Sequence, residues 1–310
     1  MKDSRIKRFL VKWYERYYAY KKEVSIPYQA YLIKKRFPIR VMTTMETLQH
    51  IIDSGCSVSR YGDGEINLML GNGIGFQEYD KELQRELIQN LQRDSLLICL
   101  PKHFDYHPLG RRATTQSMKF WNRYLIGHQK ELYELLKENH VGDRVFGDTL
   151  VTRPYIDWKD KKIAEKIYAL YRRFFSEKRL LIVEGEQTRL GVGNDLFDTA
   201  AHIRRIICPA KNAFTKIDEI IIAVRQHFDH DLILLALGPT ATVLAGRLAD
   251  EGYRALDVGH LDIEYEWLLN HANTKTPITG KYVNEAGESG QVFSNCLDVT
   301  YQKQIVCKIS

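Results

Sequence analysis

The stretch DLILLALGPTATVLAGRLAD, residues 231–250, decides the fold class. Its first part, 231–237, is a short continuous apolar run, which is typical of a strand buried on both faces of a sheet. A Gly-Pro turn follows, and 239–250 has the pattern of a helix with proline in its first turn. A buried strand followed at once by a helix is the repeating unit of a parallel α/β sheet.

The same alternation continues on both sides of this unit. Further strands are expected at 57–61, 95–100, 144–151, 180–183, 203–208 and 254–258. Helices are expected at 44–53, 80–93, 117–137, 161–175, 217–227 and 263–270. We therefore predict an α/β fold with a Rossmann-like, mostly parallel sheet and helices on both faces. One domain is expected over residues 43–310, with the Gly-, Asn- and Thr-rich segment 273–290 as a mobile surface loop.

Residues 1–42 differ from the rest in charge and are expected to form a separate arm. They contain twelve Lys and Arg against three Asp and Glu, whereas the remaining chain is slightly acidic. Five apolar and aromatic side chains recur there at helical spacing: Ile6, Phe9, Leu10, Trp13 and Tyr17. A basic, aromatic helix can lie on an anionic membrane surface. The alternative is a helix that packs on the body or on a partner subunit.

The composition argues against several classes of protein. Hydrophobic residues make up 44% and charged residues 27%, as in ordinary globular domains. No apolar run approaches the ~18 residues of a membrane span, and the N-terminus has no secretory-signal pattern. The five cysteines are widely spaced, which argues against a disulfide framework or a zinc site. Because the basic excess lies in the arm, the body is not expected to bind nucleic acid. The expected location is the cytoplasm, with the inner face of the membrane as the alternative if the arm binds lipid.

The first candidate site, RYGDGE at residues 60–65, follows the expected strand 57–61. Asp63 and Glu65 are hard oxygen ligands two residues apart, suited to Mg²⁺ or Mn²⁺. Arg60 can pair with a phosphate, and Gly62 lets the backbone approach a ligand closely. The alternative is a plain turn with a helix-capping glutamate.

Other turns at expected strand ends suit a phosphate or nucleotide. The turn EGEQTRLGVGND, 184–195, is rich in glycine, and GPT, 238–240, begins a helix whose free N–H groups favour an anion. Neither turn contains the Walker A or the G-x-G-x-x-G order, and purely structural turns are the alternative. The candidate binding residues of these and neighbouring turns are Arg153, Gly185, Thr188, Arg189, Asn212, Gly238, Pro239 and Thr240.

A fourth cluster follows the expected strand 254–258 and places ionisable side chains at every second position. Its members are His260, Asp262, Glu264 and Glu266. Such a concentration of charge needs a cation or substrate hydroxyls to compensate it. The alternative is an exposed acidic helix start, where carboxylates are favoured by the helix dipole.

Five motifs in the same order resemble the GT-D fold glycosyltransferases, a bacterial family formerly catalogued as a domain of unknown function. The motifs are RYGDGE, EGEQTRLGVGND, PAKNAF (209–214), GPT and GHLDIEYEW (259–267). The resemblance covers about residues 43–285. The family occurs in gene clusters for glycosylated adhesins and surface polysaccharides.

The resemblance implies a UDP-sugar donor and a glycan or glycoprotein acceptor. Asp63 and Glu65 would hold Mn²⁺ (or Mg²⁺) against the diphosphate. The acidic segment would lie beside the transferred hexose, with Glu266 preferred as general base and Glu264 and Asp262 behind it. A positioned base favours inversion, and a retaining mechanism, which needs no such base, stays open. A homo-oligomer is the further partner considered.

Two other readings remain open from the residues alone. The body can be a nucleotide-binding regulatory or scaffold subunit, with the arm recruiting a membrane-bound partner. An NAD-dependent oxidoreductase also fits the fold, but the dinucleotide glycine pattern is missing.

Overall fold

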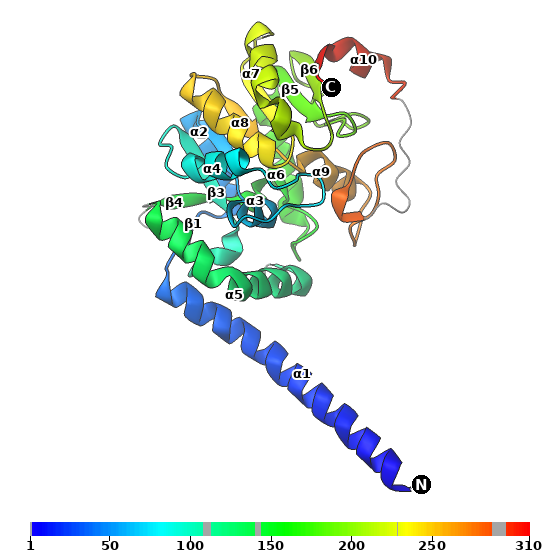
Figure 1. Cartoon of the computed structure of the whole chain (residues 1–310). Coiled ribbons are helices and arrows are strands. Elements are labelled where there is room, and N and C mark those ends of the chain that lie inside the picture. The colour runs from blue at the N-terminus through cyan, green and yellow to red at the C-terminus, as the bar shows by residue number, and fades with distance from the viewer. Residues whose placement is uncertain (1, 108–112, 140–143, 228, 287–295) are drawn as a thin grey trace.

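The computed structural model describes residues 2–107, 113–139, 144–227, 229–286 and 296–310 (Figure 1). The described residues form a nine-stranded sheet in the order β1-β4-β3-β2-β8-β7-β5-β6-β9. All neighbouring strands described in this sheet run parallel. The strands are β1 Arg40–Val41, β2 Ser57–Arg60, β3 Leu96–Leu100, β4 Val145–Asp148, β5 Arg179–Gly185, β6 His202–Cys208, β7 Leu232–Ala236, β8 Ala255–Asp257 and β9 Ile305–Lys308.

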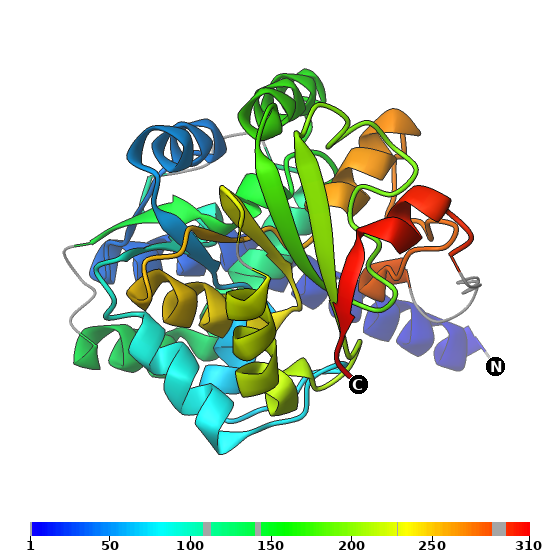
Figure 2. The ribbon, with the colours of Figure 1, turned by 90° about the horizontal axis from the view of Figure 1, so that it is seen from above.

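Helices cover both faces of the sheet, as predicted, so the core has two layers. The helices are α1 Lys2–Arg36, α2 Thr44–Ser54, α3 Asp63–Met69, α4 Lys81–Asn90, α5 Thr115–Glu138, α6 Lys162–Phe175, α7 Ile217–Gln226, α8 Pro239–Asp250, α9 Leu261–Leu269 and α10 Val299–Gln304. One layer holds α3, α4, α5, α7 and α8, and the other holds α2, α6 and α9. Figure 2, seen from above, shows α4, α7 and α8 on one side of the strands and α2 and α6 on the other.

The strand β5 shows why continuous apolar runs are needed. Leu181 and Val183 pack in one layer, while Leu180 and Ile182 pack in the other. Successive side chains of a strand point to opposite faces, so a strand covered on both faces must be apolar at every position.

Local signals set several boundaries. Thr43 and Glu46 form a capping box that begins α2, and Gly55 ends it in the left-handed conformation, with φ of 71°. The expected strand 144–151 is shorter in the structure. It ends at Asp148, whose carboxylate accepts the Leu150 N–H and begins a 3₁₀ helix, Thr149–Thr152.

The arm is one helix, α1, whose 35 residues span about 50 Å. Its last turns belong to the body, because Ala30 and Ile33 are buried in the core layer that contains α5. The exposed residues 11–16 lie on the part that extends away from the body (Figure 1). The strand β1 also joins the sheet, so the folded body begins before residue 43. Among the described residues, no helix is long and apolar enough to cross a membrane.

Candidate active site

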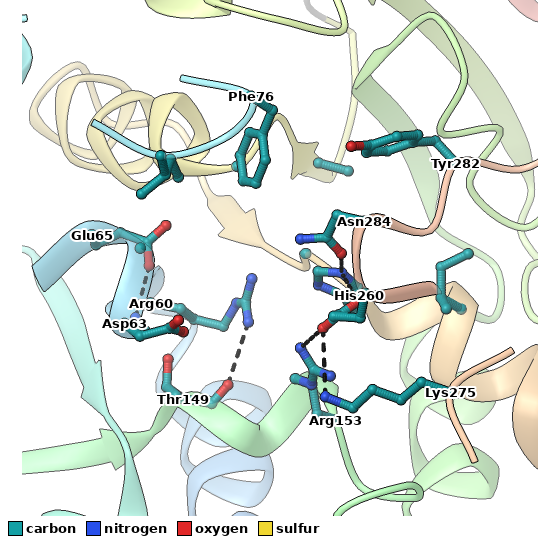
Figure 3. A pocket seen from close by; sticks show the side chains of 18 of the residues that line it. Arg60, Asp63, Glu65, Phe76, Thr149, Arg153, His260, Lys275, Tyr282 and Asn284 are labelled. Atoms are coloured by element: carbon teal, nitrogen blue, oxygen red, sulfur yellow. Dashed lines mark hydrogen bonds and ion pairs between the residues drawn. The ribbon is translucent and has the colours of Figure 1, made fainter. Parts of the chain in front are cut away.

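A cavity of about 930 Å³ opens at the carboxyl ends of the central strands (Figure 3). Arg60 ends β2, Thr149 follows β4, Gly185 ends β5, Gly238 follows β7, and Gly259 follows β8; all five line the cavity. Ligands of open parallel sheets bind outside these strand ends. The parallel topology therefore brings together turns that are up to 199 residues apart in sequence.

Arg60 is fixed at the cavity by the end of the neighbouring strand. Its Nη2 lies 2.8 Å from Oδ1 of Asp257, and its Nε donates to the Asp257 carbonyl oxygen at 2.9 Å. Nη1 donates to the Thr149 carbonyl oxygen at 3.3 Å. Gly259 makes this arrangement possible, because a Cβ there would lie 1.8 Å from Nη2 of Arg60.

Asp63 and Glu65 lie in the first turn of α3 and both line the cavity (Figure 3). One oxygen of Glu65 accepts the Gly62 N–H at 2.8 Å, so Glu65 does cap the helix. Burial, with the nearby Asp257 charge, raises the pKa of Glu65 to about 7. The Asp63 side chain is exposed and accepts no hydrogen bond from a described residue.

These two carboxylates are the residues that could hold a divalent cation. The unpaired Asp63 carboxylate and the second Glu65 oxygen are hard ligands, and positive charge would offset the cost of burying Glu65. No group of three or more His, Cys, Asp or Glu among the described residues could hold a metal. Mg²⁺ held by one or two carboxylates commonly keeps water and substrate oxygens as its other ligands.

Asn212 lines the cavity and also fixes a loop that the sequence reasoning missed. It adopts the left-handed conformation, with φ of 51°. Its N–H donates to the Phe76 carbonyl oxygen at 3.0 Å, and its Oδ1 accepts the Glu78 N–H at 2.8 Å. The Phe76 ring thereby lies against Gly238, where a Cβ would come within 2.6 Å of it. The glycine-rich run GNGIG, 71–75, before Phe76 was the available signal.

The other predicted binding residues divide into two groups. Gly62, Arg153, Gly185, Thr188, Asn212 and Gly238 line the cavity. Arg189, Pro239 and Thr240 do not line it. Pro239 and Thr240 are buried in the first turn of α8, so they shape the helix start and do not reach the cavity.

The acidic segment lies mostly behind the cavity wall. Asp262 and Glu266 share one face of α9, and both carboxylates lie within 2.8 Å of the Lys281 Nζ. Neither lines the cavity. The Glu266 carboxylate is paired with an ammonium group in this arrangement, and its role as general base stays a prediction.

Glu264 is completely buried and also lies outside the cavity lining. Its Oε2 accepts the N–H groups of Tyr155 and Ile156 at 3.0 and 2.9 Å, and its Oε1 lies 3.5 Å from Nε of Arg153. Burial raises the pKa of Glu264, and the Arg153 charge opposes that rise. In this arrangement Glu264 holds the backbone of residues 155 and 156 and lies beside the cavity-lining Arg153.

Within this segment, His260 is the predicted catalytic residue that does line the cavity (Figure 3). Its Nε2 lies 2.8 Å from Oδ1 of Asn284 and 3.0 Å from Oε2 of Glu285. Glu285 also pairs with Arg153. Burial raises the pKa of the Glu285 carboxyl, but His260 and Arg153 outweigh burial and hold that pKa well below its ordinary value.

Residues 273–277, 279 and 282 are exposed, as expected for a surface loop at 273–290, but the end of the described segment is anchored in the protein. Lys281 is 4% exposed and Val283 is fully buried. The cavity-lining residues of this segment are Asn273, Thr274, Lys275, Tyr282, Asn284 and Glu285. The polar side chains of this segment line the cavity or form ion pairs. Residues 287–290 of the expected loop lie outside the described residues.

A sequence model described as "Glycosyltransferase GT-D fold" matches residues 58–286. The chain belongs to the GT-D fold glycosyltransferase family. It is 40% identical over 275 residues to a "Probable glycosyl transferase Gly" of Streptococcus gordonii, and 40% identical over 274 residues to "Glycosyltransferase GlyD" of Streptococcus pneumoniae. These alignments cover 88% and 87% of the chain but only 39% and 33% of the two relatives.

Solved structures show the same GT-D fold. A domain of unknown function 1792, described as having a distinct glycosyltransferase fold, matches with a TM-score of 0.81 and 38% identity. That match covers 90% of this chain and 98% of the solved one. A glycosyltransferase (DUF1792) from Streptococcus sanguinis matches with a TM-score of 0.77 and 39% identity, covering 88% of this chain and 100% of the other.

Proposed function

We propose that the chain is a metal-dependent glycosyltransferase that moves a hexose from a UDP-sugar to a hydroxyl group of a glycan or glycoprotein, with inversion. The observation that carries this proposal is one cavity lined by a carboxylate pair, an arginine and an oriented histidine. These groups are Asp63, Glu65, Arg60 and His260. The family membership and the names of the relatives support the reaction class.

The first requirement is to stabilise the leaving diphosphate. A divalent cation held by Asp63 and Glu65 would neutralise charge on the phosphate oxygens. Arg60 adds a positive charge that cannot be lost, at a position fixed by Asp257. Because these groups are held before the reaction, they stabilise the developing charge without reorganisation.

The second requirement is to remove the proton of the acceptor hydroxyl. The His260 Nε2 lies 2.8 Å from Oδ1 of Asn284, so in the neutral form of the ring we assign the hydrogen to Nε2 and the lone pair to Nδ1. We assign Nδ1 as the base, oriented by Asn284 and Glu285. As Nδ1 takes the proton, the acceptor oxygen bonds to the anomeric carbon, and the sugar–phosphate bond breaks with its electron pair on the diphosphate. Attack opposite the leaving group inverts the anomeric centre.

The test is turnover of a panel of UDP-hexoses with Mn²⁺, measured as release of UDP in the presence and absence of sugar acceptors. We expect slow hydrolysis of one donor, its loss in Asp63→Asn, and normal rates in Asp198→Asn. Asp198 is an exposed carboxylate outside the cavity and provides the matched control. Binding of a nucleotide sugar without any hydrolysis or transfer would favour a regulatory nucleotide-binding subunit.

We also propose that the basic arm lies on an anionic lipid surface. Val11, Trp13 and Tyr14 are more than half exposed on α1, beside the exposed basic residues Lys12 and Arg16. Apolar side chains can enter a headgroup region while the cations pair with anionic lipids.

Co-sedimentation with phosphatidylglycerol vesicles tests the arm. Lys12→Glu combined with Arg16→Glu should lower the bound fraction, and the difference should shrink as salt rises. Turnover of a soluble donor should stay unchanged. Equal sedimentation of the variant and the native chain would refute the membrane role, and a salt-independent dimer lost in the variant would assign the arm to self-association.

A further inference from the structure

Four buried or half-buried polar side chains form a closed cluster behind the cavity wall, here called the anchor cluster: Asp262, Glu266, Asn194 and Lys281. The Lys281 Nζ lies 2.7 Å from Asp262 and 2.8 Å from Glu266. The Asn194 amide donates to the same two carboxylates, at 2.7 Å in each case. Both carboxylates are therefore satisfied inside the protein.

The anchor cluster joins three segments that are separate in sequence. Asp262 and Glu266 belong to α9, Asn194 to the glycine-rich turn after β5, and Lys281 to the 273–286 segment. Each of these three segments contributes residues to the cavity lining. The cluster itself stays outside the lining, so it acts on the cavity only through its neighbours in the chain.

The residues that follow Lys281 carry this connection into the cavity. The Tyr282 N–H donates to the Gln187 carbonyl oxygen at 2.9 Å, and both residues line the cavity. Asn284 and Glu285, three and four positions after Lys281, contact His260. A displacement of Lys281 would therefore move the two groups that orient the histidine ring.

The cluster depends on the lysine charge. Asp262 is 1% exposed and lies one helical turn from Glu266, so without Lys281 two like charges would share a nearly dry site. Removing one partner of a buried ion pair is strongly destabilising because the other charge remains uncompensated. Without the lysine, the segment would lose its tie to Asp262 and Glu266. It would keep the Tyr282 N–H bond, the turn from Lys281 to Ile278, the Arg153–Glu285 ion pair and the packing of Val283.

We propose that Lys281 is a positioning residue that ties the 273–286 segment to α9 through Asp262 and Glu266, and so sets the orientation of His260 through Asn284 and Glu285. The second half rests on the proposed function, in which His260 is the base. The tie between the 273–286 segment and α9 does not depend on the reaction and can be measured without turnover.

The test compares Lys281→Met, Lys281→Arg and a control, Lys303→Met, on an exposed lysine of α10. Amide hydrogen exchange over 273–286 should accelerate in Lys281→Met, with little change elsewhere, and stay near normal in Lys281→Arg and the control. The kcat for donor hydrolysis should fall by about 10²-fold in Lys281→Met, since small misplacements of catalytic groups have effects of that size. Lys281→Arg should recover most of it.

If Lys281→Met does not fold, the double variant Asp262→Asn and Lys281→Met is used in its place, because it keeps the net charge of the anchor cluster.

Unchanged hydrogen exchange in 273–286 would overturn the proposal that Lys281 ties this segment to α9. Faster exchange with an unchanged kcat would overturn its link to His260. A Glu266→Gln variant with normal exchange but a kcat as low as that of Lys281→Met would assign the base to Glu266 instead. Absence of turnover in the native chain would refute the proposed function, whereas hydrogen exchange would still decide the anchor.

Discussion

The Asp63/Glu65 pair and the Asp262/Glu264 pair have the same spacing in the sequence, but their aspartates have opposite environments in the molecule. In the 60–65 turn, the Asp63 carboxylate is exposed and lines the cavity. In the 260–267 segment, Asp262 and Glu264 are buried and accept hydrogen bonds from Lys281 and from backbone N–H groups. The Asp63 carboxylate can therefore still bind a ligand, whereas the carboxylates of Asp262 and Glu264 are paired within the protein.

The difference shows that the spacing of carboxylates does not tell whether their charge is already compensated inside the protein. Buried acids need partners, and once partners are found the group stabilises structure without contacting substrate. His260 is the member of the second motif that still faces the cavity, and it does so because it precedes α9 and is not part of its buried face.

The largest effect is expected from the histidine. His260→Ala should lower the kcat for transfer by about 10²–10⁴-fold, the usual contribution of a general base. The Kd of the UDP-sugar should change little, because the ring acts on the acceptor. Rapid-quench turnover together with calorimetric donor titration measures the two quantities. A kcat within a factor of about two of the native value would remove His260 from the chemistry.

Asp63 should dominate donor binding. Asp63→Ala should weaken Mn²⁺-dependent binding of the UDP-sugar by about 100-fold, because a bridging cation contributes several kcal/mol. Titration calorimetry with and without Mn²⁺ measures it, and Asp198→Ala serves as control. If the native chain binds the donor equally well after chelation, the carboxylate pair has another role.

Glu264 should affect stability more than binding, in contrast to Asp63. Glu264→Gln removes charge from an acceptor of two backbone N–H groups beside Arg153, and should lower the free energy of unfolding by about 1–3 kcal/mol. Asp63→Asn should leave it nearly unchanged. Urea unfolding of both variants compares them directly, and equal midpoints would contradict the contrast.

A pH dependence is expected from Glu65. Because its folded pKa of about 7 lies above its ordinary value of 4.5, the metal-free protein should lose stability as pH rises between these values. Metal-dependent donor binding should do the opposite and strengthen as pH rises through 7, since the cation needs the ionised carboxylate. Glu65→Gln should flatten the stability profile, which urea unfolding at pH 5 and pH 8 measures. If Glu65→Gln leaves the pH dependence of stability unchanged, that dependence comes from other groups.

The sequence by itself determined the layers of this protein. Continuous apolar runs such as 231–237 require burial on both faces, and the helix predicted at 239–250 is α8. The charge pattern set apart the exposed part of α1, and the strand-end rule placed Arg60, Gly185 and Gly238 at one cavity. These are local or topological properties, so they can be read from residue order.

Only the tertiary structure decided which polar groups face the cavity. Spacing placed Asp262 and Glu266 on one face of α9, but the packing of α9 and the position of Lys281 turned that face away from the cavity. Phe76 and Glu285 also line the cavity, although neither belongs to the five motifs that resemble the family. Whether a charge is available depends on partners distant in sequence, and their positions are fixed only when the whole core has packed.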